Sequence, residues 1–334
     1  MMGVRELTSA PRILPLYLRA AAPLVPGASL LPFVPGGGGE VPELELSLRG
    51  AQAEPERVAA YARVCGFTLA DALPATFPHV LAFPLHMAVM ADGRFPLGAV
   101  GLVHVSNRIV QHRPVRSGEA LDLRVHATPL EPHPRGRTFT IGSEARVGDE
   151  LVWEGVSTML RRGRGSDATG SAADGAGDER SPKDATVVDS IAKDAGGEPS
   201  GADAADAPVP PANAEWRLPG DLGRRYASVS GDRNPIHMHA LTAKPLGFPR
   251  AIAHGMWTKA RCLAALESRL PDSFAVEVRF RRPILLPGTV VFASEPDGDA
   301  IAFAVRGARS GEPHLEGRVE PVSKTTTNKG GKAS

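Results

Sequence analysis

The chain has 334 residues, of which 42% are hydrophobic, and it carries a formal net charge of +1. This length favours two domains, and the apolar fraction is sufficient for folded cores. The balanced charge, the 5% aromatic content and the lack of a basic stripe give no support to nucleic-acid binding. Two cysteines, Cys65 and Cys262, fall far apart in predicted helices and are typical of reduced core thiols, which indicates a cytoplasmic protein.

The N-terminal segment, residues 1–43, is predicted to be an irregular lead-in. Its apolar part, residues 13–34, raises the alternatives of a targeting signal or a membrane span. Arg19 and several prolines interrupt that stretch, and no clear cleavage site follows a short apolar core. The sequence therefore favours a segment that neither targets the chain nor enters a membrane.

The first half of the remaining chain shows the hydrophobic periods of a strand, two helices and then further strands. In chain order these are a strand from Leu44, a helix from Glu54 to Cys65 ended by Gly66, an apolar helix over 77–91 interrupted at Pro84, and strands over 103–111, 120–127, 137–147 and 151–160. A linker follows at 166–213, where large apolar side chains are almost absent and the net charge is −7. This segment cannot bury enough apolar surface to offset its ordering entropy, which predicts disorder.

The second half opens with a motif, Ser-Val-Ser-Gly-Asp-Arg-Asn-Pro-Ile-His, at residues 228–237. Asn234 precedes a proline and is a favoured N-cap, so a helical turn should begin at Pro235 and carry His237 in it. Asp232 then faces the same space, and the helix dipole should keep the imidazole neutral. A converging carboxylate and imidazole suit acid–base chemistry, although the same residues also make an ordinary structural turn.

A second element, Ala-His-Gly-Met at 253–256, opens an apolar helix that runs to about residue 270. Gly255 at the start of this helix would present an unpaired N–H group, which suits a developing oxyanion. A metal site built from Asp232, His237 and His239 lacks a convincing further ligand set, so no metal is expected. No glycine-rich nucleotide fingerprint is present, so NAD, FAD, ATP and other cofactors are not expected either.

The two halves share a plan in which an apolar helix precedes a long pair of strands. Strand 103–111 leads through a proline and a glycine into the next strand, and strand 275–281 does the same. The first copy has no carboxylate near His79 and His86, which are interpreted as structural, so one active site per chain is predicted. Four apolar residues of the first copy could line an acyl tunnel or belong to the ordinary core: Phe77, Phe83, Met87 and Met90.

The motif Y-x-x-V-S-G-D-x-N-P-I-H, followed by G-F and A-H-G-M, resembles the MaoC-like or (R)-specific enoyl-CoA hydratase (hydratase 2) family. The resemblance covers roughly residues 216–310 and implies an α+β double hotdog fold, in which each curved antiparallel sheet wraps around a central helix. It implies that Asp232 and His237 are the catalytic pair and that the Gly255 N–H binds the thioester oxygen. Supporting residues are Asn234, Ser230 and Gly231. A polar residue that some family members carry along the central helix falls here on an apolar one, near Leu263.

These observations predict five segments: a lead-in at 1–43, a first hotdog without the catalytic motif at 44–165, the linker at 166–213, a catalytic hotdog at 214–322 and a polar tail at 323–334. The predicted function is reversible hydration of trans-2-enoyl thioesters to (3R)-3-hydroxyacyl thioesters in fatty-acid or related acyl metabolism. The alternatives are an acyl-CoA thioesterase and a non-catalytic subunit that binds acyl thioesters.

The expected partner is an acyl-CoA or acyl carrier protein thioester, with no nucleic acid or membrane. Because the whole chain carries +1 and the linker −7, the rest carries +8, which suits a phosphate-bearing carrier. The chain is expected to be a monomeric double hotdog or a homodimer.

Overall fold

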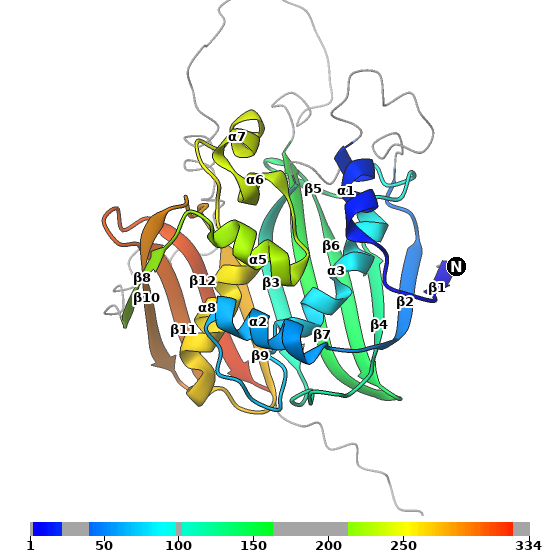
Figure 1. Cartoon of the computed structure of the whole chain (residues 1–334), viewed down its shortest axis with the longest axis horizontal. Helices are drawn as coiled ribbons and strands as arrows, with labels where there is room; N and C mark the ends of the chain where they lie inside the picture. The colour runs from blue at the N-terminus through cyan, green and yellow to red at the C-terminus, as the bar shows by residue number, and fades with distance from the viewer. Residues whose placement is uncertain (1–2, 22–39, 98–101, 163–212, 323–334) are drawn as a thin grey trace, which may run out of the picture.

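A computed structural model describes residues 3–21, 40–97, 102–162 and 213–322, so the predicted polar tail and all but residue 213 of the predicted linker lie outside the described residues. The described strands form one 12-stranded sheet in the order β1-β2-β4-β6-β7-β3-β9-β12-β11-β10-β8, with β5 paired to β6 (Figure 1). The strands are β1 (Gly3–Leu7), β2 (Leu44–Ala51), β3 (Leu102–Gln111), β4 (Leu121–Ala127), β5 (Glu131–His133), β6 (Gly136–Val147), β7 (Glu150–Arg162), β8 (Ala214–Leu218), β9 (Phe274–Phe280), β10 (Gly288–Asp297), β11 (Ala300–Gly307) and β12 (Pro313–Pro321).

The helices lie together on one face of this sheet (Figure 1). They are α1 (Ile13–Ala21), α2 (Pro55–Cys65), α3 (Phe77–Met90), α5 (Leu222–Ser230), the short α6 (Pro235–Met238) and α7 (Ala240–Ala243), and α8 (Gly255–Leu266), with 3-10 turns at Lys244–Leu246 and Glu267–Arg269. The predicted strands and helices of both halves are confirmed, with ends that move by a few residues.

The sheet consists of two halves that meet at the antiparallel pair β3–β9, where Ser106 pairs with Arg279 and Gln111 pairs with Phe274. The first half places β2, β4, β6, β7 and β3 behind α3, and the second places β8, β10, β11, β12 and β9 behind α8 (Figure 1). Each half is a curved sheet with a central helix, and the two join as one continuous sheet. The α+β double hotdog prediction is confirmed.

The sequence predicts an interruption of the central helix of the first half at Pro84, but α3 runs through Pro84 to Met90. An interior proline costs a helix roughly 3 kcal/mol. Nearly every residue of α3 is buried, and the packing of this helix against the sheet outweighs that local cost.

The N-terminal segment is not irregular where the structure describes it. β1 pairs in parallel with β2, and α1 packs on α3. The inward face of α1 carries Ile13, Leu16, Tyr17 and Ala20, which follow helical spacing. Pro15 is compatible with this helix because it lies in the first turn, where no intrahelical N–H bond is needed.

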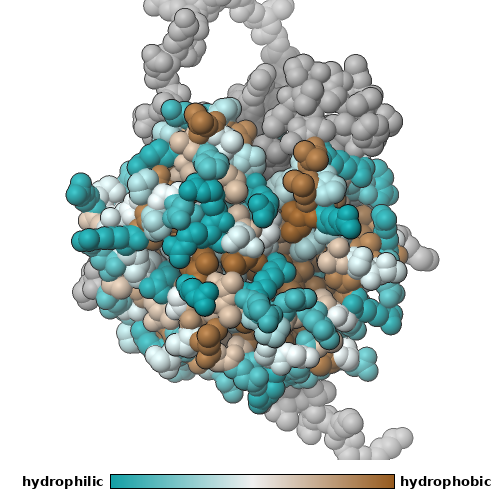
Figure 2. Space-filling model, viewed as in Figure 1, coloured by the Kyte–Doolittle hydropathy of each residue, from teal (hydrophilic) through white to brown (hydrophobic). Residues whose placement is uncertain are grey.

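Exposed hydrophobic side chains mark the outer sides of two short helices. Leu14 and Leu18 of α1 and Leu241 of α7 are exposed, and brown colour gathers over these helices on an otherwise mostly hydrophilic face (Figure 2). Within the described residues, no helix is long and apolar enough to cross a membrane.

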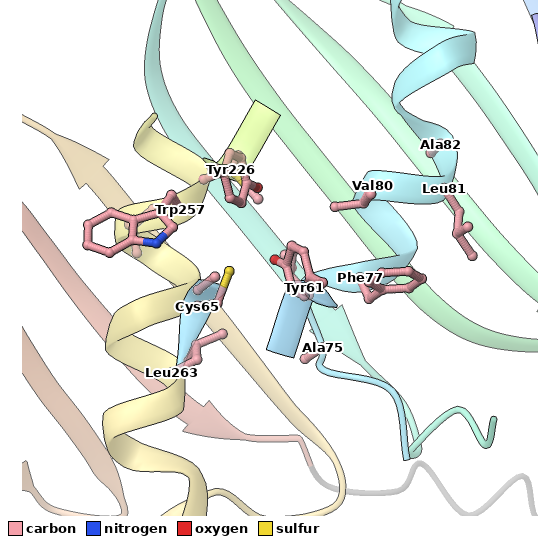
Figure 3. Packing of buried hydrophobic residues seen from close by; sticks show 14 of the residues in the cluster. Tyr61, Cys65, Ala75, Phe77, Val80, Leu81, Ala82, Tyr226, Trp257 and Leu263 are labelled. Atoms are coloured by element: carbon pink, nitrogen blue, oxygen red, sulfur yellow. The ribbon is translucent and has the colours of Figure 1, made fainter. Parts of the chain in front are cut away.

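Helix α2 of the first half packs against α5 and α8 of the second half. The Tyr61 ring lies edge-on to Phe77 at 5.2 Å between centroids and 6.0 Å from the Tyr226 ring (Figure 3). Trp257 Nε1 donates a hydrogen bond to the Val64 carbonyl at 3.0 Å. The contacts fix the two helices that carry the motifs 228–237 and 253–256.

A buried lysine also connects the halves. Lys259 of α8 is completely buried, and its Nζ donates to Asn107 O at 3.2 Å, to Asn107 Oδ1 at 2.5 Å and to Val276 O at 3.1 Å. Three acceptors match the three protons of an ammonium group. The apolar pattern of this helix does not predict the burial of Lys259, because the hydrogen-bond partners of its ammonium group come from two strands of the sheet.

Candidate active site

The predicted turn forms at the junction of α5 and α6. Helix α5 ends at Gly231, whose φ of 83° is favoured by glycine. The Ser230 hydroxyl donates to the Tyr226 carbonyl at 2.9 Å and accepts from the Asp232 N–H at 3.1 Å. Asn234 caps α6 as predicted, with its side chain accepting from the Ile236 N–H. Local hydrogen bonds thus define the direction of the Asp232 side chain.

Asp232 has one carboxylate oxygen occupied by protein donors. Its Oδ1 accepts from the Tyr17 hydroxyl at 2.7 Å and from the Asn234 N–H at 3.1 Å. Burial works to raise the pKa of Asp232, but the neighbouring His254 and His237 imidazoles and these two donors hold that pKa below its ordinary value. The carboxylate is therefore ionised at neutral pH and accepts protons or hydrogen bonds.

His237 is buried and oriented by the backbone. Its Nδ1 lies 2.8 Å from the Ile252 carbonyl, so this nitrogen carries the proton and Nε2 keeps its lone pair. Burial lowers the pKa of His237, which keeps the ring neutral and basic. The helix dipole invoked from the sequence is not the cause, because α6 has only four residues.

His254 belongs to the motif at 253–256, and no role for it was predicted from the sequence. Its ring stacks on His237 with 3.7 Å between centroids, and its Nε2 donates to the Asp232 backbone carbonyl at 3.0 Å. Burial lowers the pKa of His254 to about 3. A neutral His254 against His237 allows the latter to take up a proton without a second charge beside it.

Gly255 is the first residue of α8, so its N–H has no acceptor within the helix. A Cβ atom at this position would lie 2.9 Å from Cε1 of Phe280, so any larger residue would require that ring to move. Gly255 lines the same cavity as Asp232 and His237. The three predicted catalytic residues are therefore brought together at one wall.

The cavity has a volume of about 270 Å³ and is built by both halves of the chain. Of the four apolar residues considered for a tunnel, Phe83 and Met90 line it, whereas Phe77 and Met87 belong to the buried core. Leu263 is buried in the core too, so that position of α8 offers no hydrogen bond to the site.

The chain is similar to known proteins over most of its length. A family model described as "MaoC like domain" matches residues 212–315. The chain is 35% identical over 303 residues to 3-hydroxyacyl-thioester dehydratase X of Mycobacterium tuberculosis, covering 90% of this chain and 95% of that protein. The chain belongs to the MaoC-like dehydratase family.

Two solved structures have a similar architecture. The crystal structure of HtdX of Mycobacterium tuberculosis aligns with a TM-score of 0.67 and 31% identity, covering 83% of this chain and 100% of that one. A MaoC-like dehydratase from Phytophthora capsici aligns with a TM-score of 0.62 at 17% identity, which concerns the fold alone. The family predicted from the motif is confirmed.

The part of this MaoC-like dehydratase matched by the family model contains Asp232, His237, His254 and Gly255. Tyr17 comes from outside it, 215 positions before Asp232. Its hydroxyl also accepts from the Arg233 N–H at 2.9 Å. Tyr17 does not line the described cavity, so its hydroxyl contacts the Asp232 carboxylate from the side that faces away from the cavity.

A metal ion is an alternative use of three of these side chains. Single donor atoms of Asp232, His237 and His254 lie within 4.8 Å of one another, a set that three-ligand metal sites also use. His239 is not in this group of three. Its exposed ring lies instead beside Arg224, with 3.4 Å between its Nδ1 and the guanidinium.

Proposed function

We propose that the chain catalyses the reversible hydration of trans-2-enoyl thioesters to 3-hydroxyacyl thioesters, with Asp232 and His237 as the catalytic pair. The observation that carries this proposal is the convergence of an ionised carboxylate, a neutral imidazole with a free Nε2 and the Gly255 N–H on one cavity. The names of two relatives support it: 3-hydroxyacyl-thioester dehydratase X and the 3-hydroxybutyryl-CoA dehydratase of Methylorubrum extorquens. The second relative is 40% identical over 63 residues, which cover 18% of this chain and 40% of that protein.

The separation of the pair suits one water molecule. A carboxylate oxygen of Asp232 and a ring nitrogen of His237 lie no more than 4.8 Å apart. Both can accept a hydrogen bond from one water molecule held about 2.8 Å from each. The water oxygen attacks C3 of the enoyl thioester while one of its protons passes to His237 Nε2. The imidazolium, stabilised by Asp232, then gives that proton to C2. In total, a C3–O bond and a C2–H bond form, while one O–H bond of water breaks and the C2=C3 double bond becomes a single bond.

Dehydration is the reverse of these steps. His237 removes the C2 proton, and the hydroxyl leaves C3 with that proton as water. Asp232 holds the departing hydroxyl through its carboxylate oxygen not engaged by Tyr17.

Negative charge develops on the thioester oxygen in both directions. The Gly255 N–H at the start of α8 would stabilise it, and removing one such donor costs about 3 kcal/mol in comparable sites.

We further propose that the first half, residues 44–165, encloses the acyl chain and that the carrier is coenzyme A or an acyl carrier protein. Phe83 and Met90 support the first point because they line the cavity. Arg281 and Arg282 also line the cavity, but their guanidinium groups are paired with Glu316 and Glu312, so a phosphate would have to share them. The support for the second point is the net charge of +8 outside the linker, which suits a phosphate-bearing carrier. The (3R) configuration of the product follows from the family resemblance.

The test follows the loss of enoyl-thioester absorbance with crotonyl-CoA and longer chains for wild type, Asp232→Asn and His237→Gln. Each substitution should lower kcat by about 10²- to 10⁴-fold. Matched controls are Asp272→Asn and His239→Gln, which change exposed residues outside the cavity and should keep the wild-type rate.

Other outcomes identify the alternatives. Release of free coenzyme A without hydration would make the protein a thioesterase, and thioester binding without turnover would make it a non-catalytic subunit. Loss of the rate on treatment with a chelator would favour the metal-binding use of Asp232, His237 and His254.

The cytoplasmic location and the monomer or homodimer arrangement stay predictions. Light scattering of the purified chain and fractionation of cells that express it would test them.

A further inference from the structure

Three imidazoles from the first half line the cavity in addition to the catalytic pair. His79 and His86 lie two turns apart on α3, with 4.9 Å between their ring centroids, and His104 lies on β3. Apolar side chains surround them, among them Val80, Phe83, Met90, Leu102 and Ile141. An acyl tunnel that takes only a hydrocarbon chain has no need of such polar groups.

The hydrogen bonds of these rings are incomplete. His86 Nε2 pairs with the Ser143 hydroxyl at 2.7 Å. In contrast, His104 Nε2 is buried without a hydrogen-bond partner among the described residues, although the ring has a backbone hydrogen bond with Ser106. The His79 ring is buried, lines the cavity and lies edge-on to His86. Buried polar atoms are almost always paired, so the unpaired His104 Nε2, in a cavity that His79 also lines, points to a polar ligand group.

The cluster is neutral. Burial lowers the pKa of His86 to about 3 and that of His104 to about 4, and it lowers the pKa of His79 as well. Lys259 is close by, but its three protons are already donated to Asn107 and Val276. Nothing described in the cluster therefore offers a free cation for a carboxylate or a phosphate.

Neutral imidazoles suit a hydroxyl group, because each ring offers one donor and one acceptor and a hydroxyl does too. We assign this hydroxyl to a position beyond the reacting carbons, on the side of Phe280 away from Gly255. The Phe280 ring lies between the two regions: it is 4.9 Å from the His104 ring and would touch a Cβ atom at Gly255.

We propose that His79 and His104 form a subsite for an uncharged hydroxyl group carried on the acyl chain, beyond the carbons that react. The subsite deepens the proposed function and rests on it. A plain hydrocarbon chain would displace water from both rings and leave them unpaired, and this should favour the hydroxylated chain by on the order of 10- to 100-fold.

The test compares trans-2-enoyl-CoA substrates of equal length, one plain and others with a hydroxyl moved along the chain beyond the fourth carbon. The measured quantity is the ratio of kcat/KM for the hydroxylated and plain substrates. This ratio does not depend on how much of a variant is folded. Wild type should prefer one hydroxyl position, and His79→Phe and His104→Phe should each lower the ratio about tenfold or more, in part by improving turnover of the plain chain.

His112→Phe is the matched control, because His112 pairs with Glu154 at 2.7 Å and does not line the cavity; its ratio should equal that of wild type. A wild-type preference for the plain chain, or equal ratios in wild type and both cavity variants, would overturn the subsite.

A binding measurement separates this inference from the proposed reaction. Saturated acyl-CoAs with and without the hydroxyl cannot be hydrated, so calorimetric titration measures the subsite alone. Tighter binding of the hydroxylated ligand to wild type, lost in His104→Phe, supports the subsite even if no enoyl thioester is turned over. Equal binding of both ligands contradicts it even if crotonyl-CoA is hydrated.

Discussion

Replacing Tyr17 by phenylalanine removes one hydroxyl group next to the candidate catalytic carboxylate and keeps the ring that packs beside it. That hydroxyl donates to Asp232 Oδ1 at 2.7 Å and accepts from the Arg233 N–H at 2.9 Å. Burial beside Asp232 raises the pKa of Tyr17, so the phenol remains a donor across the working pH range. The substitution should therefore disturb both the charge and the position of the carboxylate.

The expected size follows from the hydrogen bond. A hydrogen bond to a charged group contributes about 1.5–3 kcal/mol, and one pKa unit corresponds to about 1.4 kcal/mol. The Asp232 side chain is 28% exposed, so water will replace part of the lost interaction. We expect the pKa of Asp232 to rise because the carboxylate loses a donor, which moves the part of the acidic limb of kcat/KM that this group controls to higher pH. Looser placement should also lower the plateau by about three- to tenfold.

The assay is the pH dependence of kcat/KM with crotonyl-CoA, which reports groups of the free enzyme. Tyr61→Phe is a matched control, since it removes a buried hydroxyl that donates to Thr76 Oγ1 at 2.8 Å and has no bond to Asp232. Tyr61→Phe should change stability but leave the acidic limb in place. A Tyr17→Phe profile that superimposes on that of wild type would refute the role assigned to this tyrosine.

Three further predictions concern the oxyanion donor, the buried lysine and the neutral histidines. Gly255→Ala keeps the backbone N–H but forces the Phe280 ring to shift, which should displace this donor and lower kcat by about 10- to 100-fold with little change in KM; a wild-type kcat would contradict a dependence of the rate on the close packing at Gly255. Lys259→Met leaves three buried acceptors unpaired and should lower the free energy of unfolding by roughly 3 kcal/mol in urea titrations, whereas an unchanged midpoint would show that these bonds contribute nothing. In the folded protein the pKa values of His86, His104 and His254 are lowered to about 3 to 4, whereas the unfolded residues bind protons near pH 6.5. The free energy of unfolding that these residues contribute is therefore fully present above about pH 6.5. Below that pH it falls by up to about 1.4 kcal/mol per histidine and pH unit. Urea midpoints that stay constant between pH 7.5 and pH 5 would contradict this buried, neutral state.

The sequence was most informative where structure is local. The Asn234-Pro235 step determines a cap and a helical turn through bonds within a few residues, so the direction of Asp232 and His237 could be predicted. The alternation in β2 and the apolar helices of both halves likewise predicted the duplicated fold, because these periods depend on which face is buried.

Contacts between distant segments could not be predicted in this way. Tyr17 reaches Asp232 only because α1 packs on α3, although the spacing of Ile13, Leu16, Tyr17 and Ala20 was a usable sign of an inward face. The roles of Lys259 and His104 depend on strand pairing between the two halves, which no local pattern specifies.

The central claim is that this cavity adds water across the double bond of an enoyl thioester. The most direct measurement incubates trans-2-enoyl-CoA with the protein in D₂O and analyses the product by mass spectrometry and chiral chromatography. We predict a (3R)-3-hydroxyacyl thioester with one deuterium at C2, formed at least 10²-fold more slowly by His237→Gln, and no free coenzyme A. Recovery of unchanged enoyl thioester, or of free coenzyme A alone, from wild-type protein that binds acyl-CoA would contradict the account.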